Sequence, residues 1–227
     1  MSARKSTPRP ATRGDAKRQA ITEAATQAFL SQGYAAVSMD AVAAEAGVSK
    51  RTVYNHFPSK RELFRAVVAQ LYAGLLEAER GGLPVDDPPE RALPRFAREL
   101  LAHLRRPGVM GLLRLVVAEQ HRFPELALDF HTEGKGPAIA LLERYLAAQH
   151  QRGRLKVPDA TVAAQQFLGG VKEGVFWPAL LGLPVTRDDD QVIAAAVAAL
   201  LTVYRPDRRT GDEREETRSL GRGERDR

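Results

Sequence analysis

The chain has 227 residues, of which 44% are hydrophobic, so it can bury a full core as one large domain or two moderate ones. It contains no cysteine, which excludes disulfides and thiolate metal sites. No apolar run reaches the roughly 18 residues of a membrane span, and no apolar segment follows the basic N-terminus as it would in a signal peptide. We therefore expect a soluble, cytoplasmic protein with no membrane partner.

The net charge of +6 is concentrated in the first third of the chain. Residues 1–70 contain 11 Lys and Arg against 5 Asp and Glu, whereas residues 71–204 contain 15 against 16 and residues 205–227 contain 8 against 7. Because phosphate contacts supply most sequence-independent affinity for DNA, this division is typical of a nucleic-acid-binding domain attached to a neutral domain.

Residues 1–14 are predicted to form a disordered basic arm, because they mix Arg, Lys, Ser, Thr and Pro without apolar periodicity. Arg4, Lys5, Arg9 and Arg13 could follow the minor groove of DNA, as basic arms before helix-turn-helix modules do. A solvated tail is the alternative interpretation.

Residues 15–65 are predicted to form a three-helix unit. Its first helix is amphipathic, covers about residues 15–31 and ends near Gly33. We expect this helix to brace the two shorter helices after it.

The stretch from Ser38 to Phe57 has the pattern of a helix-turn-helix. Ser38 is a natural N-cap for a helix whose apolar residues fall at i, i+3, i+4 and i+7 between residues 39 and 46. Gly47 ends that helix, and Ser49 caps a second, short helix that runs to Phe57. Two helices joined by so short a turn are the arrangement that this DNA-binding motif needs.

The second helix has one apolar face and one hydrogen-bonding face. Val53 and Phe57 share the apolar side, while Arg51 and Asn55 project almost opposite them with Thr52 on the flank. Arg can bind guanine, Asn can bind adenine and the Thr methyl can touch thymine, so these three are the expected base-reading residues. The other residues expected to contact DNA, mainly its phosphates, are Ser38, Ser49, Lys50, Tyr54, His56 and Lys60.

Pro58 ends this helix, and Ser59 with Glu62 is placed to form a capping box that starts the next. The exposed amides there, beside Lys60, favour a phosphate site. The new helix should continue to about Arg80 and connect two domains.

The motifs at 33–34 (Gly-Tyr), 38–40 (Ser-Met-Asp), 46–50 (Ala-Gly-Val-Ser-Lys) and 52–64 (Thr-Val-Tyr-Asn-His-Phe-Pro-Ser-Lys-Arg-Glu-Leu-Phe) resemble the N-terminal domain of TetR-family transcriptional regulators. The resemblance covers roughly residues 15–65 and implies sequence-specific binding of double-stranded DNA. Without it, two capped helices around a turn could simply pack a helical protein.

Residues 66–204 are predicted to be a helical effector-binding and dimerisation domain, so the whole fold is expected to be all-α. Helices are expected near 90–105, 107–122 and 124–150, the last with a loop or kink at Gly134. Residues 205–227 are charged and almost free of large apolar side chains, so we expect a disordered tail.

Residues 158–182 and 188–204 are predicted to be the two most apolar helices, and both are rich in small side chains that permit close helix approach. We expect them to form a four-helix interface with a second copy of the chain, which makes the protein a homodimer. A buried hairpin within one chain is the alternative. The interface candidates are Gly169, Gly170, Phe176, Leu180, Val192, Ala196, Ala199 and Leu200.

The segments 114–119 (Arg-Leu-Val-Val-Ala-Glu), 121–126 (His-Arg-Phe-Pro-Glu-Leu) and 166–169 (Gln-Phe-Leu-Gly) resemble the AefR-like subgroup of TetR C-terminal domains. The resemblance implies a pocket for a small, apolar or amphipathic effector of unknown identity. Candidates to line it are Phe96, Leu100, Met110, Leu113, Val117, His121, Phe130, Phe167 and Trp177. Each of these is also a plausible plain core residue, because such side chains occur at helical spacing in every bundle.

The sequence favours no catalytic residue, metal site or cofactor. The five histidines lack metal-ligand spacing, and there is no Walker loop, Rossmann glycine signature or nucleophile elbow, so an enzyme is disfavoured. The predicted function is a ligand-responsive DNA-binding regulator, a repressor released from a palindromic operator by its effector. The alternatives are an architectural DNA binder with little sequence preference and a small-molecule enzyme or carrier with a vestigial helix-turn-helix.

Overall fold

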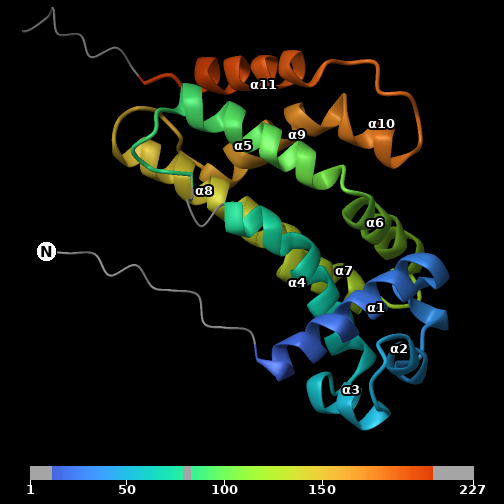
Figure 1. Cartoon of the computed structure of the whole chain (residues 1–227). Helices are drawn as coiled ribbons and strands as arrows, with labels where there is room; N and C mark the ends of the chain where they lie inside the picture. The colour runs from blue at the N-terminus through green and yellow to red at the C-terminus, as the bar shows by residue number, and fades with distance from the viewer. Residues whose placement is uncertain (1–11, 79–82, 207–227) are drawn as a thin grey trace, which may run out of the picture.

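The structure is a computed structural model that describes residues 12–78 and 83–206. Within these ranges every regular element is a helix, which confirms the predicted all-α class. A small three-helix lobe lies at one end and a larger helical bundle at the other, with one long helix running between them (Figure 1).

The small lobe consists of α1 (Arg13–Ala36), α2 (Met39–Glu45) and α3 (Lys50–His56). Its core is aromatic: the rings of Phe29 and Tyr34 stack at 5.5 Å, and Phe64 of the following helix meets Tyr34 edge-on, also at 5.5 Å. α1 kinks at Gly33, where φ is +82°, a conformation that favours glycine. The kink lets the chain turn toward α2.

The first helix starts earlier than the sequence predicted. Thr12 accepts a hydrogen bond from the backbone of Asp15, and the Asp15 carboxylate accepts one from the backbone of Thr12. This reciprocal capping box starts α1 at Arg13, so residues 12–14 do not belong to a disordered arm. Arg4, Lys5, Arg9 and the predicted tail beyond residue 206 lie outside the described residues.

α4 (Lys60–Ala78) begins in the small lobe and ends in the bundle. The predicted domain boundary at residue 65 therefore falls inside one uninterrupted helix, and it stays a prediction. Ser59 accepts the first-turn hydrogen bond from Glu62 N–H, as the capping box predicts, but the Glu62 carboxylate accepts from Arg65.

The bundle follows the chain from α5 to α11. The helices are α5 (Pro89–Leu104), α6 (Pro107–Glu119), α7 (Glu125–Phe130), a π-helix (His131–Lys135), α8 (Gly136–Gln151), α9 (Ala160–Glu173), α10 (Phe176–Leu180) and α11 (Asp189–Val203). α11 packs on α5 and α9, while α6 and α7 lie beside α1 and the start of α4.

Two predicted helices differ from those in the structure. The loop or kink predicted at Gly134 is a π-helical turn, in which Gly136 N–H donates to the carbonyl of His131. A Cβ at Gly136 would lie 2.6 Å from that carbonyl oxygen, so the turn requires glycine there. The helix predicted over 158–182 is two helices, because the chain leaves helical geometry between Gly174 and Phe176.

Candidate nucleic-acid interface and apolar cavity

α3 is held at the tip of the small lobe by its apolar face. Val53 and Phe57 are buried, whereas Arg51, Tyr54 and Asn55 are exposed. Ser49 caps the helix by accepting a hydrogen bond from Thr52 N–H at 3.2 Å, and its hydroxyl also lies 2.8 Å from that of Thr52. The Thr52 hydroxyl is therefore engaged locally, which leaves its methyl group as the part available to a base.

The turn between α2 and α3 has the predicted geometry. Gly47 has φ of +63°, and Val48 N–H donates to the carbonyl of Ala43 at 3.0 Å, so the end of α2 is satisfied by the backbone. Ser38 accepts from Ala41 N–H at the start of α2, which confirms its role as N-cap. Together these caps hold α2 and α3 as a rigid pair.

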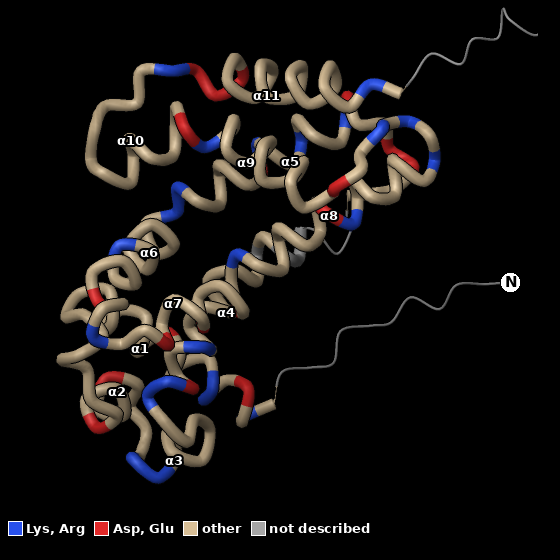
Figure 2. The backbone as a smooth tube through the Cα atoms, turned by 180° about the vertical axis from the view of Figure 1, so that it is seen from behind, with Lys and Arg blue, Asp and Glu red and all other residues tan. Residues whose placement is uncertain are grey.

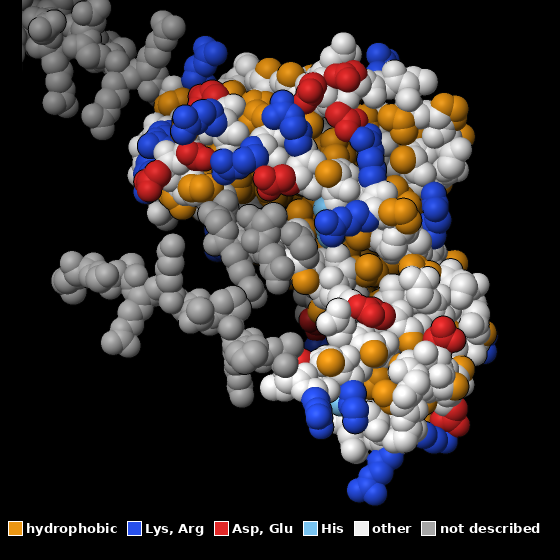
Figure 3. Space-filling view, viewed as in Figure 1, with side chains coloured by type: hydrophobic (Ala, Val, Ile, Leu, Met, Phe, Trp, Pro, Cys, Tyr) orange, Lys and Arg blue, Asp and Glu red, His pale blue; other side chains and the backbone are white. Residues whose placement is uncertain are grey.

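Lys and Arg gather at the tip that carries α3 (Figures 2 and 3). Lys50 is paired with Asp40 of α2 at 2.8 Å, and both side chains are largely exposed. An exposed pair of this kind contributes little to stability, so a phosphate can compete with Asp40 for Lys50. His56 is half-buried, and its carbonyl accepts from Arg18, whose guanidinium lies over the Phe57 ring.

Lys60 has a different setting from the one that the sequence predicted. Its ammonium group donates to the carbonyl of Ala35 at 3.1 Å and lies over the Tyr34 ring at 4.6 Å. Burial lowers the pKa of Lys60, an effect that nearby Glu119 opposes. The side chain thus links the end of α1 to the start of α4, and its contact with a DNA phosphate stays a prediction.

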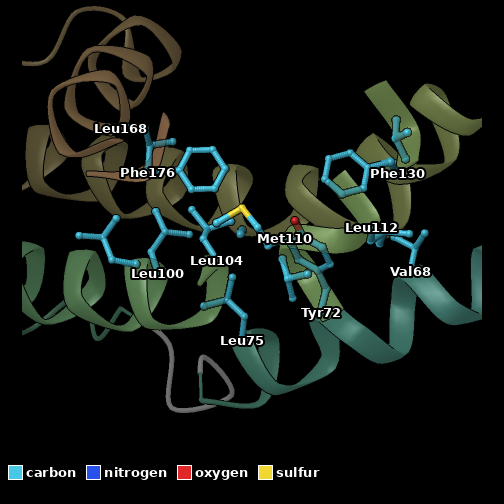
Figure 4. Packing of buried hydrophobic residues seen from close by; sticks show 14 of the residues in the cluster. Val68, Tyr72, Leu75, Leu100, Leu104, Met110, Leu112, Phe130, Leu168 and Phe176 are labelled. Carbon is cyan, nitrogen blue, oxygen red and sulfur yellow. The ribbon is translucent and has the colours of Figure 1, made fainter. Parts of the chain in front are cut away.

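The bundle contains a mainly apolar, partly open cavity of about 160 Å³ between α4, α5, α8, α9 and α10. Figure 4 shows Phe176 and Phe130 on opposite sides, with Tyr72 projecting from α4 toward Met110. The predicted pocket residues that line it are Phe96, Leu100, Leu113, Phe130 and Trp177.

Four other predicted pocket residues lie elsewhere. Met110 and Phe167 are buried in the surrounding core, while Val117 is 60% exposed and His121 also lies on the surface. Val117 and His121 are therefore corrected: they lie on the outward side of α6 and in the turn after it. Periodicity places residues on a common face, but it does not say which face meets the cavity.

The structure adds polar residues that the sequence did not single out. Tyr72, Lys135 and Lys172 line the cavity. His103 is buried against the Tyr72 ring, with centroids 4.8 Å apart, and neither of its ring nitrogens has a partner among the described residues. Burial, with a smaller effect of Arg106, lowers the pKa of His103 to about 4.

A short segment joins the cavity to the small lobe. Asp129 accepts two hydrogen bonds from Arg61 of α4, both at 2.8 Å, and Glu133 accepts two from Arg65, one of which is 2.9 Å long. Phe130 and Lys135 of the same segment line the cavity. Residues 129–135 therefore contact both the cavity and the first turns of α4.

The predicted dimer residues divide into two groups. Phe176, Leu180, Ala196 and Leu200 are buried within the chain, and Val192 is half-buried. Gly169, Gly170 and Ala199 are exposed, so these three and the accessible part of Val192 can face a second copy, although Gly170 also packs near Ala196. Exposed apolar side chains missed by the sequence reasoning lie on α9, α11 and the segment after α10, and they are Val162, Leu181, Leu183 and Val203.

Two other kinds of site are missing from the described part of the chain. No helix within residues 12–78 and 83–206 is long and apolar enough to cross a membrane. No group of three or more His, Asp or Glu side chains in the same ranges could hold a metal ion.

Comparison with known proteins agrees with this architecture. The model of the AefR-like transcriptional repressor C-terminal domain matches residues 91–206, and the model of bacterial regulatory proteins of the tetR family matches residues 21–67. The chain belongs to the TetR family. The N-terminal match contains α2, α3 and the start of α4, and the C-terminal match contains most of the bundle.

Individual TetR-family relatives cover different shares of the chain. A TetR-family regulator from Mesorhizobium loti is 30% identical, with a TM-score of 0.74, over 86% of this chain and 99% of that one. The flavonoid-responsive regulator FrrA is 33% identical, with a TM-score of 0.72, over 84% and 98%. The transcriptional activator FasR of Mycolicibacterium smegmatis is 41% identical over 69 residues, which are 30% of this chain and 32% of FasR. The chain spans between 24% and 54% of the length of the curated relatives that it matches.

Proposed function

We propose that this TetR-family chain is a homodimeric, sequence-specific DNA-binding regulator whose affinity for a palindromic operator is lowered by a small molecule in the bundle cavity. The observation that carries the proposal is the exposed face of α3, where Arg51 and Asn55 project outward opposite buried Val53 and Phe57. In a two-fold dimer two such helices would enter successive major grooves about 34–36 Å apart. A regulator of this kind acts on the chromosome, so we place it in the cytoplasm.

The segment at residues 129–135 supports the ligand-responsive part of the proposal. A molecule that displaces Phe130 or Lys135 also acts on a backbone that carries Asp129 and Glu133, the partners of Arg61 and Arg65. Movement of this segment would therefore shift α4, which begins directly after α3. The ligand must prefer the DNA-incompetent arrangement, since equal affinity for both would shift nothing.

We further propose that the protein is a repressor. The family model that matches the bundle describes AefR-like repressors, whereas FasR, related through a shorter stretch, is an activator. FrrA is flavonoid-responsive, which supports a small-molecule effector for this chain without identifying it.

The direct test is selection of bound fragments from genomic DNA with the purified full-length chain. We expect enrichment of one palindromic sequence whose half-sites lie about one helical turn apart. Enrichment without a common sequence would support an architectural binder in place of a sequence-specific regulator. No retained DNA at physiological salt would support a ligand-binding protein with a vestigial helix-turn-helix.

A further inference from the structure

Two lysines line an otherwise mainly apolar cavity. Lys135 comes from the π-helix and Lys172 from α9, and both line the cavity. Apart from these ammonium groups and the hydroxyl of Tyr72, the lining is aliphatic or aromatic and includes no carboxylate from the described residues. The described lining therefore combines two positively charged residues with a mainly apolar surface.

The positive charges of Lys135 and Lys172 are not balanced by a negative charge in the cavity lining. Lys172 is half-buried, and its pKa is lowered first by burial and then by the charge of Lys135. Neither lysine has a hydrogen bond or ion pair with any other residue in the described part of the chain. An anion close to both side chains would offset the unfavourable effect of exposed Lys135 on the charge of half-buried Lys172.

Several other cations near the cavity-bearing bundle are paired with carboxylates of the chain. Arg105 pairs with Asp189, and Arg98 pairs with Asp190 at 2.7 Å. In the connecting segment Arg61 binds Asp129 through two hydrogen bonds. Lys135 and Lys172 have no such carboxylate partner among the described residues.

We propose that the cavity takes an amphipathic carboxylate, whose apolar body lies among Phe96, Phe130 and Phe176 and whose carboxylate binds between Lys135 and Lys172. This inference deepens the proposed function and rests on its ligand-responsive part. A carboxylate has two acceptor oxygens, one for each ammonium group.

The chain offers a built-in reporter for this binding. Trp177 lines the cavity and is the single tryptophan of the sequence, so a change in its emission reports occupancy. The probes are octanoate with the matched octanol and octylamine, and cyclohexylacetate with cyclohexylethanol. We expect each acid to change the emission at a concentration roughly 10- to 100-fold below its alcohol, the range that charge-assisted hydrogen bonds supply. Octylamine should bind more weakly than octanol.

Variants assign the preference to the two lysines. Lys172→Met and Lys135→Met should each reduce the preference for acid over alcohol, and the double variant should abolish it, while affinity for the alcohols stays close to wild type. Lys172→Arg should keep the preference because it keeps the charge. Lys17→Met, on the exposed surface of α1, is the matched control and should behave as wild type. Circular dichroism checks that each variant retains its helices.

Several results would overturn the proposal. The first is that the alcohols bind as tightly as the acids. The second is that the double variant still prefers the acids. The third is that no probe changes the tryptophan emission up to millimolar concentrations. Operator binding is measured separately with the same acids. If the acids bind as expected but operator affinity does not change, the ligand chemistry stands and the ligand-responsive function fails.

Discussion

His103 is a buried imidazole whose pKa of about 4 keeps it neutral in the folded protein. Its ordinary pKa is 6.5, so the unfolded chain takes up a proton between pH 6.5 and 4 while the folded chain does not. The folded state is therefore not penalised above pH 6.5 and loses stability as the pH falls toward 4. The ring packs on Tyr72, and Arg106 is the charged group that adds to the effect of burial.

We expect His103→Phe to reduce this acid sensitivity. Between pH 7 and pH 5 the free energy of unfolding of the wild type should fall by about 2 kcal/mol more than that of the variant. The measurement is urea denaturation at one fixed chain concentration, because the stability of the proposed dimer would depend on concentration. At pH 7 the variant should be at least as stable as wild type, since it removes a buried group without partners among the described residues. If the free energy of unfolding of both proteins fell equally between pH 7 and pH 5, His103 would not be the source of the acid sensitivity.

The contacts of Lys60 could not be predicted from its neighbours in the sequence. Its position after a capping box predicted an exposed phosphate contact, but the kink of α1 at Gly33 brings the Ala35 carbonyl and the Tyr34 ring to its ammonium group. A contact between residues 25 positions apart cannot be read from local spacing. The same holds for Lys172, whose place in the cavity lining depends on residues of α4 and α5 far away in the sequence.

Among the elements, those with explicit start and stop residues were predictable. Ser38, Gly47 and Ser49 bound α2 and α3 as expected, because capping depends on neighbours in the chain. The π-helix and the break before α10 were not predicted as such. Their geometry depends on packing between distant residues, as where Gly134 lies against Tyr72 and Val68.

The connection between α4 and the segment at residues 129–135 yields a prediction of its own. The Asp129 side chain is 6% exposed, so Arg61→Met would leave a buried carboxylate without its cation and should cost about 1–3 kcal/mol of stability. The double variant Arg61→Met with Asp129→Leu should recover much of that loss, because it also removes the buried charge. Urea denaturation measures both.

The matched control is Arg91→Met, since Arg91 pairs with Asp87 at 3.0 Å but is 72% exposed. This change should cost less than about 1 kcal/mol. A double variant at positions 61 and 129 as unstable as the sum of its two single variants would show that the residues do not act as a coupled pair.

At the scale of the whole molecule, the dimer is the part of the proposal that sequence periodicity located least well. Sequence periodicity selected apolar residues of α9, α10 and α11 as interface candidates. Half of these candidates are buried in the chain's own core, because the same helices also pack on each other. The exposed remainder, with Ala199 on α11 and Val203 68% exposed beside it, is the face left for a second copy.

We therefore expect Ala199→Glu to produce monomers in sedimentation velocity at micromolar concentrations, because it places a charge on an apolar contact surface. Ala102→Glu on the exposed side of α5 is the control and should leave the dimer intact. If both variants remained dimers, the interface would lie elsewhere on the chain.

The central claim is that the outward face of α3 reads a DNA sequence. Its most direct test is the affinity of wild type, Arg51→Ala and Lys17→Ala for the selected operator and for a random duplex of equal length. Arg51→Ala should weaken operator binding by about 1–3 kcal/mol and reduce the difference between operator and random DNA, while Lys17→Ala should preserve that difference. Arg51→Ala that binds both duplexes as wild type does would contradict the account.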